Sequence, residues 1–203
     1  MSSFYGDWPR LVHEATSLST VAVELSALSE PELVPLVEFL SEQPPLPFLY
    51  LSVHAPSKGR EMPEDEFVDV LMQLEDRVNA IVMHPDVITD ISVYAPLGAR
   101  LVLENMDRRK PIGQTAADLA EFFSALPEAG LCFDVPHAAS VDVSLEVAGE
   151  ILDQHGHRLR HVHLSSLDDA CHHTTLTSED REDFRALLDR CRDVPWILEA
   201  PPA

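Results

Sequence analysis

The sequence predicts an α/β fold, a compact (β/α)8 TIM barrel that lacks its last helix. Short apolar runs alternate about eight times with segments of helical periodicity, and no hairpin signal interrupts them. This alternation is typical of parallel strands joined by helices. Nearly every apolar run also ends in an acidic residue or a histidine, at the position where barrels of this class carry their catalytic groups.

The first half of the chain contains four predicted strands and three predicted helices. Asp7 precedes Trp8 and Pro9, and Ser29 precedes Pro31; both patterns are helix starts. Runs rich in β-branched and aromatic residues predict the strands. We expect strands at residues 2–5, 20–25, 48–54 and 80–85, and helices at residues 7–18, 29–40 and 63–78.

The second half continues the alternation. Residues 86–99 contain Pro96 and Gly98, so we expect only a turn or two of helix there. The Asp134-Val135-Pro136-His137 phrase follows an apolar strand, and we expect a loop at this point. We expect strands at residues 100–105, 130–134, 159–164 and 196–199, and helices at residues 115–126, 141–155 and 178–192. Prolines follow the last strand and prevent a covering helix, so we expect an exposed apolar strip there. Two alternatives are open: a homodimer forms through this strip, or the N-terminal helix shifts over to cover it.

The composition indicates one globular domain spanning residues 1–203. The three cysteines form no C-x-x-C pair, and we interpret them as reduced thiols. No apolar run reaches the roughly 18 residues that cross a bilayer, and the N-terminus has no signal-peptide pattern, so we expect a cytoplasmic protein without a membrane partner. The alternative fold, an open doubly wound sheet, requires a glycine-rich phosphate loop that the sequence lacks.

The formal net charge of -21 at pH 7 argues against duplex DNA as a partner, because an acidic surface repels phosphates. Four cations follow strand ends and are candidates for binding a small phosphate: Lys58, Arg60, Arg108 and Arg109.

Seven predicted strands end in side chains that bind metals, namely Glu24, His54, His84, Glu104, Asp134, His163 and Glu199. In a closed parallel barrel these strand ends meet at one face. Imidazole nitrogens and carboxylate oxygens are ligands for zinc, manganese, iron or cobalt. Converging carboxylates would repel one another without a cation, so the pattern predicts a divalent metal.

Further histidines lie near these strand ends. We interpret His161 as a core residue that supports His163, and we expect His155, beside Gly156, to be exposed. His172 and His173 follow a strand, and at least one of them could reach over the site. No other feature of its strand supports Glu24 as a metal ligand, so the simpler interpretation is a solvated or hydrogen-bonded side chain.

Six phrases resemble the xylose isomerase-like TIM barrel superfamily, which includes sugar phosphate isomerases/epimerases and the endonuclease IV-like enzymes of AP endonuclease family 2. They are Val53-His54-Ala55-Pro56, Met83-His84-Pro85, Leu103-Glu104-Asn105-Met106, Phe133-Asp134-Val135-Pro136-His137, His161-Val162-His163-Leu164-Ser165 and Leu198-Glu199-Ala200-Pro201. The resemblance extends from Glu24 to Pro201, and the order and spacing of the phrases are specific to the superfamily.

The isomerase members imply one divalent ion, such as Mn, Zn, Co or Mg, held by Glu104, Asp134, His163 and Glu199. This resemblance further implies that Glu104 and Glu199 are catalytic. They would move a carbon-bound proton of a sugar or sugar phosphate through a metal-stabilised enediolate.

The endonuclease members imply three zinc ions and a larger ligand set. Eight positions match that set: His54, His84, Glu104, Asp134, His137, His163, His172 and Glu199. That family carries an aspartate two residues before the last loop histidine. Here that position is Ala170 if His172 is the match, and Asp169 is one residue away.

Three functions are therefore open: an isomerase or epimerase, a multi-metal phosphodiesterase, and a non-catalytic barrel that binds metal or sugar. The number of bound ions and the reaction they support would separate the three.

Overall fold

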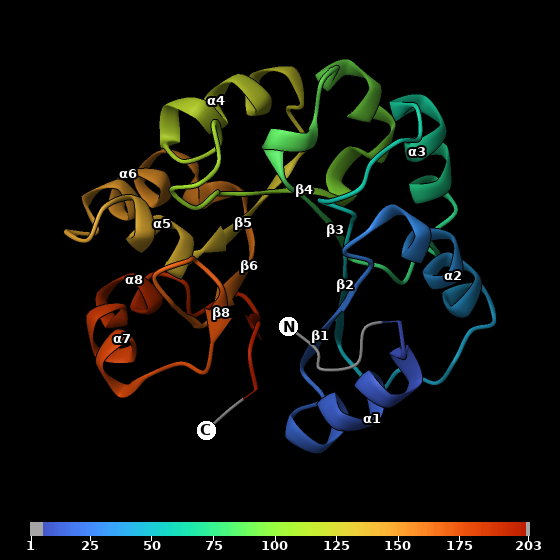
Figure 1. Ribbon diagram of the computed structural model, residues 1–203, viewed down its shortest axis with the longest axis horizontal. Helices are drawn as coiled ribbons and strands as arrows, with labels where there is room; N and C mark the ends of the chain where they lie inside the picture. Colours follow the sequence, from blue (N-terminus) through green and yellow to red (C-terminus); the bar gives the residue numbers. More distant parts are fainter. Residues whose placement is uncertain (1–5, 202–203) are drawn as a thin grey trace.

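The predicted barrel is confirmed. The computed structural model describes residues 6–201, and in it seven parallel strands form a nearly closed barrel with helices around the outside (Figure 1). The strands pair in the order β1-β2-β3-β4-β5-β6-β9. Their bounds are β1 Ala22–Ser26, β2 Tyr50–His54, β3 Ala80–Met83, β4 Leu101–Glu104, β5 Gly130–Asp134, β6 Leu159–Leu164 and β9 Trp196–Leu198. The strand expected at residues 2–5 lies outside the described residues.

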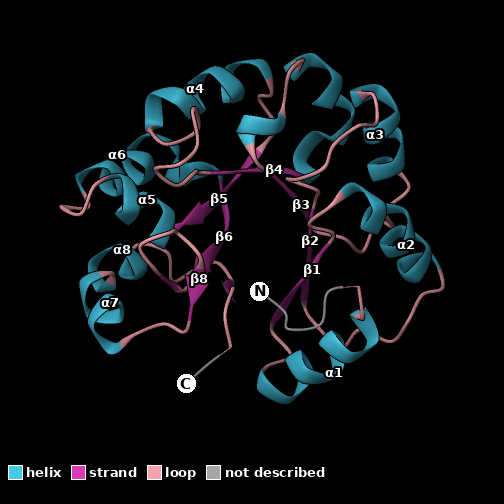
Figure 2. Cartoon of the chain, in the orientation of Figure 1, coloured by secondary structure: helices cyan, strands magenta, loops and turns pink. Residues whose placement is uncertain are grey.

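Helices surround the barrel because their apolar residues recur at helical spacing (Figure 2). In α2, for example, Leu33, Leu36 and Leu40 are fully buried. The α-helices of this ring are α1 Trp8–Leu18, α2 Glu30–Ser41, α3 Glu64–Met72, α4 Ala116–Ala125, α5 Val135–Val141, α6 Glu146–His155, α7 Ser178–Asp183 and α8 Arg185–Asp189. Three short 3-10 helices are η1 Pro85–Val87, η2 Ile91–Arg100 and η3 Gly156–Arg158.

The strand register brings the predicted strand ends to one mouth of the barrel. Ser26 lies beside His54, and Asp134 lies beside His163. Glu104 ends β4 and lies beside Cys132, one layer below Asp134. Because all of these strands are parallel, their carboxyl ends share this mouth.

The segment after β5 differs from the expected loop. Helix α5 begins at Val135, directly after the strand, and Asp134 is its N-cap. The Asp134 carboxylate accepts a hydrogen bond from the backbone N–H of His137 over 2.6 Å. The expected helix at residues 141–155 is α6, which begins later, at Glu146, and α5 is an additional helix in the segment expected as a loop. A Pro at the start of a helix has a favourable backbone angle, and this explains how Pro136 fits.

Three further expectations need correction. The loop after β6 contains an antiparallel pair, β7 Ser166–Leu167 with β8 His173–Thr174, although the sequence shows no hairpin signal. His155 is buried rather than exposed, and its Nε2 lies 2.8 Å from the carbonyl oxygen of Ala116. The segment before β4 holds more helix than a turn or two, in η1 and η2.

The outer side of β9 is poorly covered. Trp196 is 42% exposed and Leu198 is 48% exposed, whereas Ile197 between them is buried. This alternation is what a strand with only one packed face produces. Among the described residues, no helix combines the length and apolar character needed to span a membrane.

Glu64 joins α3 to the segment before η2, and its replacement by glutamine is expected to lower stability. Its carboxylate accepts hydrogen bonds from the Thr89 and Asp90 backbone N–H groups and from the Tyr94 hydroxyl, each at 2.9 Å. Burial raises the Glu64 pKa, but these hydrogen bonds and that of the Thr89 hydroxyl outweigh it, so the net pKa is lowered. Glu64→Gln should cost about 1 kcal/mol of unfolding free energy, measured by urea denaturation.

The pH dependence of the unfolding free energy tests this explanation of Glu64. Because the folded-state pKa of Glu64 is lowered, the stabilisation is present above the unfolded pKa and disappears as the pH falls through the folded pKa. The difference between wild type and Glu64→Gln should therefore shrink in acid. A constant difference between pH 7 and pH 3 would contradict this explanation.

Candidate metal centre

Glu104 lies at the centre of the barrel mouth, and each of its carboxylate oxygens faces two histidines. Oε2 is 3.3 Å from Nε2 of His54 and 3.2 Å from Nε2 of His84. Oε1 is 3.2 Å from Nδ1 of His137 and 3.4 Å from Nδ1 of His163. The side chain of Glu104 is 1% exposed, so this charge is balanced by its neighbours rather than by water.

The described residues contain four groups of metal-type ligands. One of them, Cys132, His161 and His163, is fully buried, and the other three lie around Glu104 at the mouth. In each group one ligand atom per residue lies within 4.8 Å of the others. The three groups at the mouth are His54, His84 and Glu104; then Glu104, Asp134, His163 and Glu199; then Asp134, His137 and His173. Glu104 is shared by the first two groups, and Asp134 by the last two, so the groups form one continuous cluster across the mouth.

The spacing of these atoms fits ions held between them. Donors about 2.1 Å from a tetrahedral zinc ion are about 3.4 Å apart. Nδ1 of His163 lies 3.5 Å from Oε1 of Glu199, close to that value. Several buried atoms here also lack a hydrogen-bond partner, including Oδ2 of Asp134, Nδ1 of His163 and Oε2 of Glu199. Buried polar atoms without partners are costly, so this donor set suits divalent ions.

The same crowding displaces the pKa values of the carboxylates in opposite directions. Burial raises the pKa of Glu104, but the charges of His163 and His84 outweigh burial and hold it well below its usual value. Burial raises the pKa of Asp134 well above its usual value, and the negative charges of Glu199 and Glu104 add to this. Carboxylates that share a site behave in this way when no cation is bound.

Comparison with known proteins agrees with the barrel fold. A family model described as xylose isomerase-like TIM barrel matches residues 51–201. The chain belongs to the xylose isomerase-like TIM barrel family. Among solved structures, endonuclease IV from Thermus thermophilus is similar in fold, with a TM-score of 0.62 and 21% sequence identity. That match covers 99% of this chain and 90% of the other. A comparison with curated proteins finds no match.

His173, and not His172, is the loop histidine that contacts the ligand cluster of this xylose isomerase-like barrel. Nδ1 of His173 is 3.1 Å from Oε2 of Glu199 and 2.8 Å from the Ser165 hydroxyl oxygen. The His172 side chain is 68% exposed and lies 3.1 Å from Asp168. If His173 is the matching position, the residue two places before it is Cys171, which is also not an aspartate.

Glu24 does not end its strand. It lies in the middle of β1, one layer below the mouth, and its carboxylate oxygens are 3.1 Å from Nε2 of His163 and 3.5 Å from Nε2 of His161. The Ser52 hydroxyl donates a 2.7 Å hydrogen bond to it. His161 is fully buried and lies 2.8 Å from the Tyr50 hydroxyl, in agreement with its interpretation as a core residue.

Two residues of the site were missed from the sequence. The Asn105 amide donates to the carbonyl oxygen of Asp134 and accepts from its N–H, each at 2.8 Å, which fixes the end of β5. Asp107 is buried, with Oδ2 3.9 Å from Nε2 of His137. Burial raises its pKa, but Arg109 outweighs burial and lowers it to about 2. Both residues follow Glu104, the last residue of β4, and this position in the sequence could have identified them as site residues.

The mouth opens into a cavity of about 680 Å³ that also reaches α1 and β9. Three cations line it: Lys58, Arg109 and Lys110. Two of the four expected phosphate-binding cations lie elsewhere. Arg60 is bonded to Tyr94 and stacked on Phe67, and Arg108 donates to the backbone of Asp169.

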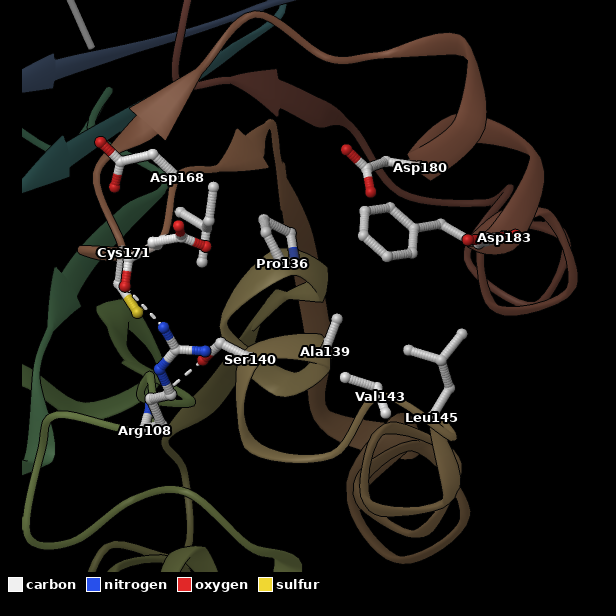
Figure 3. A pocket seen from close by; sticks show the side chains of 13 residues that line it. Arg108, Pro136, Ala139, Ser140, Val143, Leu145, Asp168, Cys171, Asp180 and Asp183 are labelled. Carbon is white, nitrogen blue, oxygen red and sulfur yellow. Dashed lines mark hydrogen bonds between the residues drawn. The ribbon is translucent and has the colours of Figure 1, made fainter.

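A second hollow of about 470 Å³ lies beside α5, between Arg108 and Asp183 (Figure 3). Asp168, Asp180 and Asp183 line it, together with apolar side chains such as Val143. None of the clustered ligand residues lines this hollow, which adjoins the mouth cavity at Cys171.

Proposed function

We propose that this chain is a multi-metal hydrolase of phosphodiesters. The observation that carries the proposal is the position of Glu104, with one oxygen toward His54 and His84 and the other toward His137 and His163. A carboxylate shared between neighbouring ions is suited to two-metal sites about 3.5–4 Å apart. An isomerase with a single ion leaves the His54 and His84 ligands without a role.

Zinc is the ion that we propose, because the set is rich in imidazole. When bound, zinc ions would polarise the phosphoryl oxygens and lower the pKa of a water molecule. The ligands proposed are His54, His84, Glu104, Asp134, His137, His163, His173 and Glu199.

The protein's own groups would orient the phosphodiester and exclude water. Lys58 and Arg109 line the same cavity as Glu104 and place positive charge beside the mouth. Arg109 is held in place by the carboxylate of buried Asp107, with nitrogen–oxygen distances of 2.8 and 2.9 Å. The Ser165 hydroxyl and Glu199 lie beside Nδ1 of His173 and would fix the orientation of this ligand's ring.

The substrate that fits best is a small phosphodiester. The cavity has the volume of a small-molecule site, and the net charge of -21 opposes a broad contact with nucleic acid. The net charge alone does not exclude DNA as a substrate, however, because a structural neighbour is an endonuclease. A duplex with an abasic site is therefore the second substrate to assay.

The second candidate is a sugar or sugar-phosphate isomerase or epimerase. It is favoured by the proximity of Glu104, Asp134, His163 and Glu199. By resemblance, these positions match the single-ion set of the isomerase members. In this alternative Glu104 and Glu199 would exchange a carbon-bound proton with the sugar.

Metal content measured on untagged protein separates these functions. We expect two or three zinc ions per chain, together with hydrolysis of a chromogenic phosphodiester. One ion per chain with turnover of a ketose would contradict the hydrolase and support the isomerase. Bound metal without turnover of phosphodiester, abasic duplex or sugar would support a binding barrel instead.

We also propose self-association through the outer side of β9, where Trp196 and Leu198 are exposed near exposed Leu18 and Val21 of the cavity rim. Sedimentation at micromolar concentration should give a dimer of the 22.6 kDa chain. Trp196→Lys should shift it to monomer. A wild-type monomer that does not change on dilution would contradict this interface.

A further inference from the structure

The barrel interior below the metal centre contains a carboxylate that the proposed hydrolysis does not use. The Glu24 side chain is 6% exposed, and its neighbours are Ser52, His161 and His163. Transferring a carboxylate from water to such a position costs several kcal/mol unless nearby groups compensate it. A side chain of this kind therefore calls for a physical role.

The ring of His163 connects this carboxylate to the metal centre. Its Nδ1 faces the mouth, 3.4 Å from Glu104 and 3.5 Å from Glu199. Its Nε2 faces the interior, 3.1 Å from Oε1 of Glu24. One imidazole thus lies between the proposed ions on one side and a buried carboxylate on the other.

We infer that Glu24 is a positioning residue for the metal centre: it accepts a hydrogen bond from the Nε2–H of His163 and so keeps Nδ1 free to bind zinc. This inference rests on the proposed function, because it requires His163 to be a ligand. Histidine ligands generally donate their second ring N–H to a carboxylate or carbonyl, which sets the tautomer and the ring orientation.

The surroundings of Glu24 fit this role and not that of a ligand at the mouth. The Ser52 hydroxyl holds Oε2, and His161, itself bonded to Tyr50, lies on the same side. Oε1 is left for His163. The N–H of His163 is not yet aligned for a hydrogen bond, since both ring nitrogens lack an aligned partner. The 3.1 Å separation is within hydrogen-bond reach, and we expect zinc at Nδ1 to bring the ring into line.

Strand geometry explains how the sequence places this residue. Val23 and Leu25 are buried against the helices, so Glu24 between them points into the barrel. Its strand neighbour is Ser52 in the register of β1 and β2.

The test compares zinc binding by wild type and by Glu24→Gln, using competition with a chromophoric chelator. Glutamine keeps the shape but loses the charge and one acceptor. We expect one zinc ion per chain to bind roughly 10–100-fold more weakly, with the remaining zinc unchanged. Glu64→Gln is the matched control: it removes a hydrogen-bonded carboxylate distant from the mouth and should lower stability without changing zinc affinity.

A second measurement needs no variant. In the zinc-loaded wild type, ¹⁵N chemical shifts should show His163 protonated at Nε2 and coordinated through Nδ1. A proton on Nδ1, coordination through Nε2, or equal zinc affinity in Glu24→Gln would overturn the role of Glu24 while leaving the hydrolase proposal intact. A wild-type chain that binds no zinc would overturn both.

Discussion

Glu104→Gln is expected to remove metal from two ligand groups at once. The carboxylate faces His54 and His84 with one oxygen, and His137 and His163 with the other. An amide offers one oxygen, and its NH₂ group is a donor that cannot bind a cation. Losing a residue that only hydrogen-bonds to a ligand weakens metal binding by roughly 10–100-fold. Glu104 is itself a proposed ligand, so we expect zinc affinity in both groups to fall by at least roughly 100-fold. We also expect the proposed hydrolysis to be abolished.

The measurement is zinc per chain by elemental analysis after dialysis. His84→Asn is the comparison variant, because His84 belongs to only one group and should cost one ion. If Glu104→Gln retains as many ions as wild type, the shared-carboxylate arrangement is wrong.

Two substitutions of Asp134 should separate its structural role from its metal-binding role. Oδ1 accepts from the His137 backbone and caps α5, whereas Oδ2 has no hydrogen-bond partner and faces the mouth. Asp134→Asn keeps a cap, while Asp134→Ala removes it at a cost of about 1 kcal/mol. Both variants should lose tight zinc binding, since Asp134 belongs to two of the ligand groups.

Without zinc, Asp134→Asn should be more stable than wild type at neutral pH. Burial, together with the charges of Glu199 and Glu104, raises the folded-state pKa of Asp134. The folded chain then binds more protons than the unfolded chain between the two pKa values, so wild-type stability falls as the pH rises through that window. Asparagine removes this dependence. Thermal unfolding of both metal-free proteins at pH 5 and pH 8 gives the comparison, and a less stable variant at pH 8 would contradict it.

The strand ends could be predicted because two simple rules determine them. Apolar runs predict the strands, and parallel strands place their carboxyl ends at one mouth. His54, His84 and Glu104 needed nothing further to be brought together. The family also followed from the order of these phrases, since each strand end lies on a separate βα unit.

The remaining features depend on tertiary contacts that no local pattern records. His172 and His173 are neighbours, and the β7–β8 pairing decides which one faces Glu199. Glu24 alternates with Val23 and Leu25, a pattern shared by a strand with one face in water. Only closure of the barrel turns that polar face into an interior layer.

The ligands at the mouth come from residues between His54 and Glu199, on strands spread over most of the chain. Contacts between residues so distant in sequence form slowly and require most of the barrel to be assembled. An ion at this position therefore joins interactions that are completed late in folding. Groups that meet after the rate-limiting step leave the folding rate nearly unchanged and slow unfolding instead. We expect bound zinc to lower the unfolding rate of the barrel and to leave its folding rate nearly unchanged.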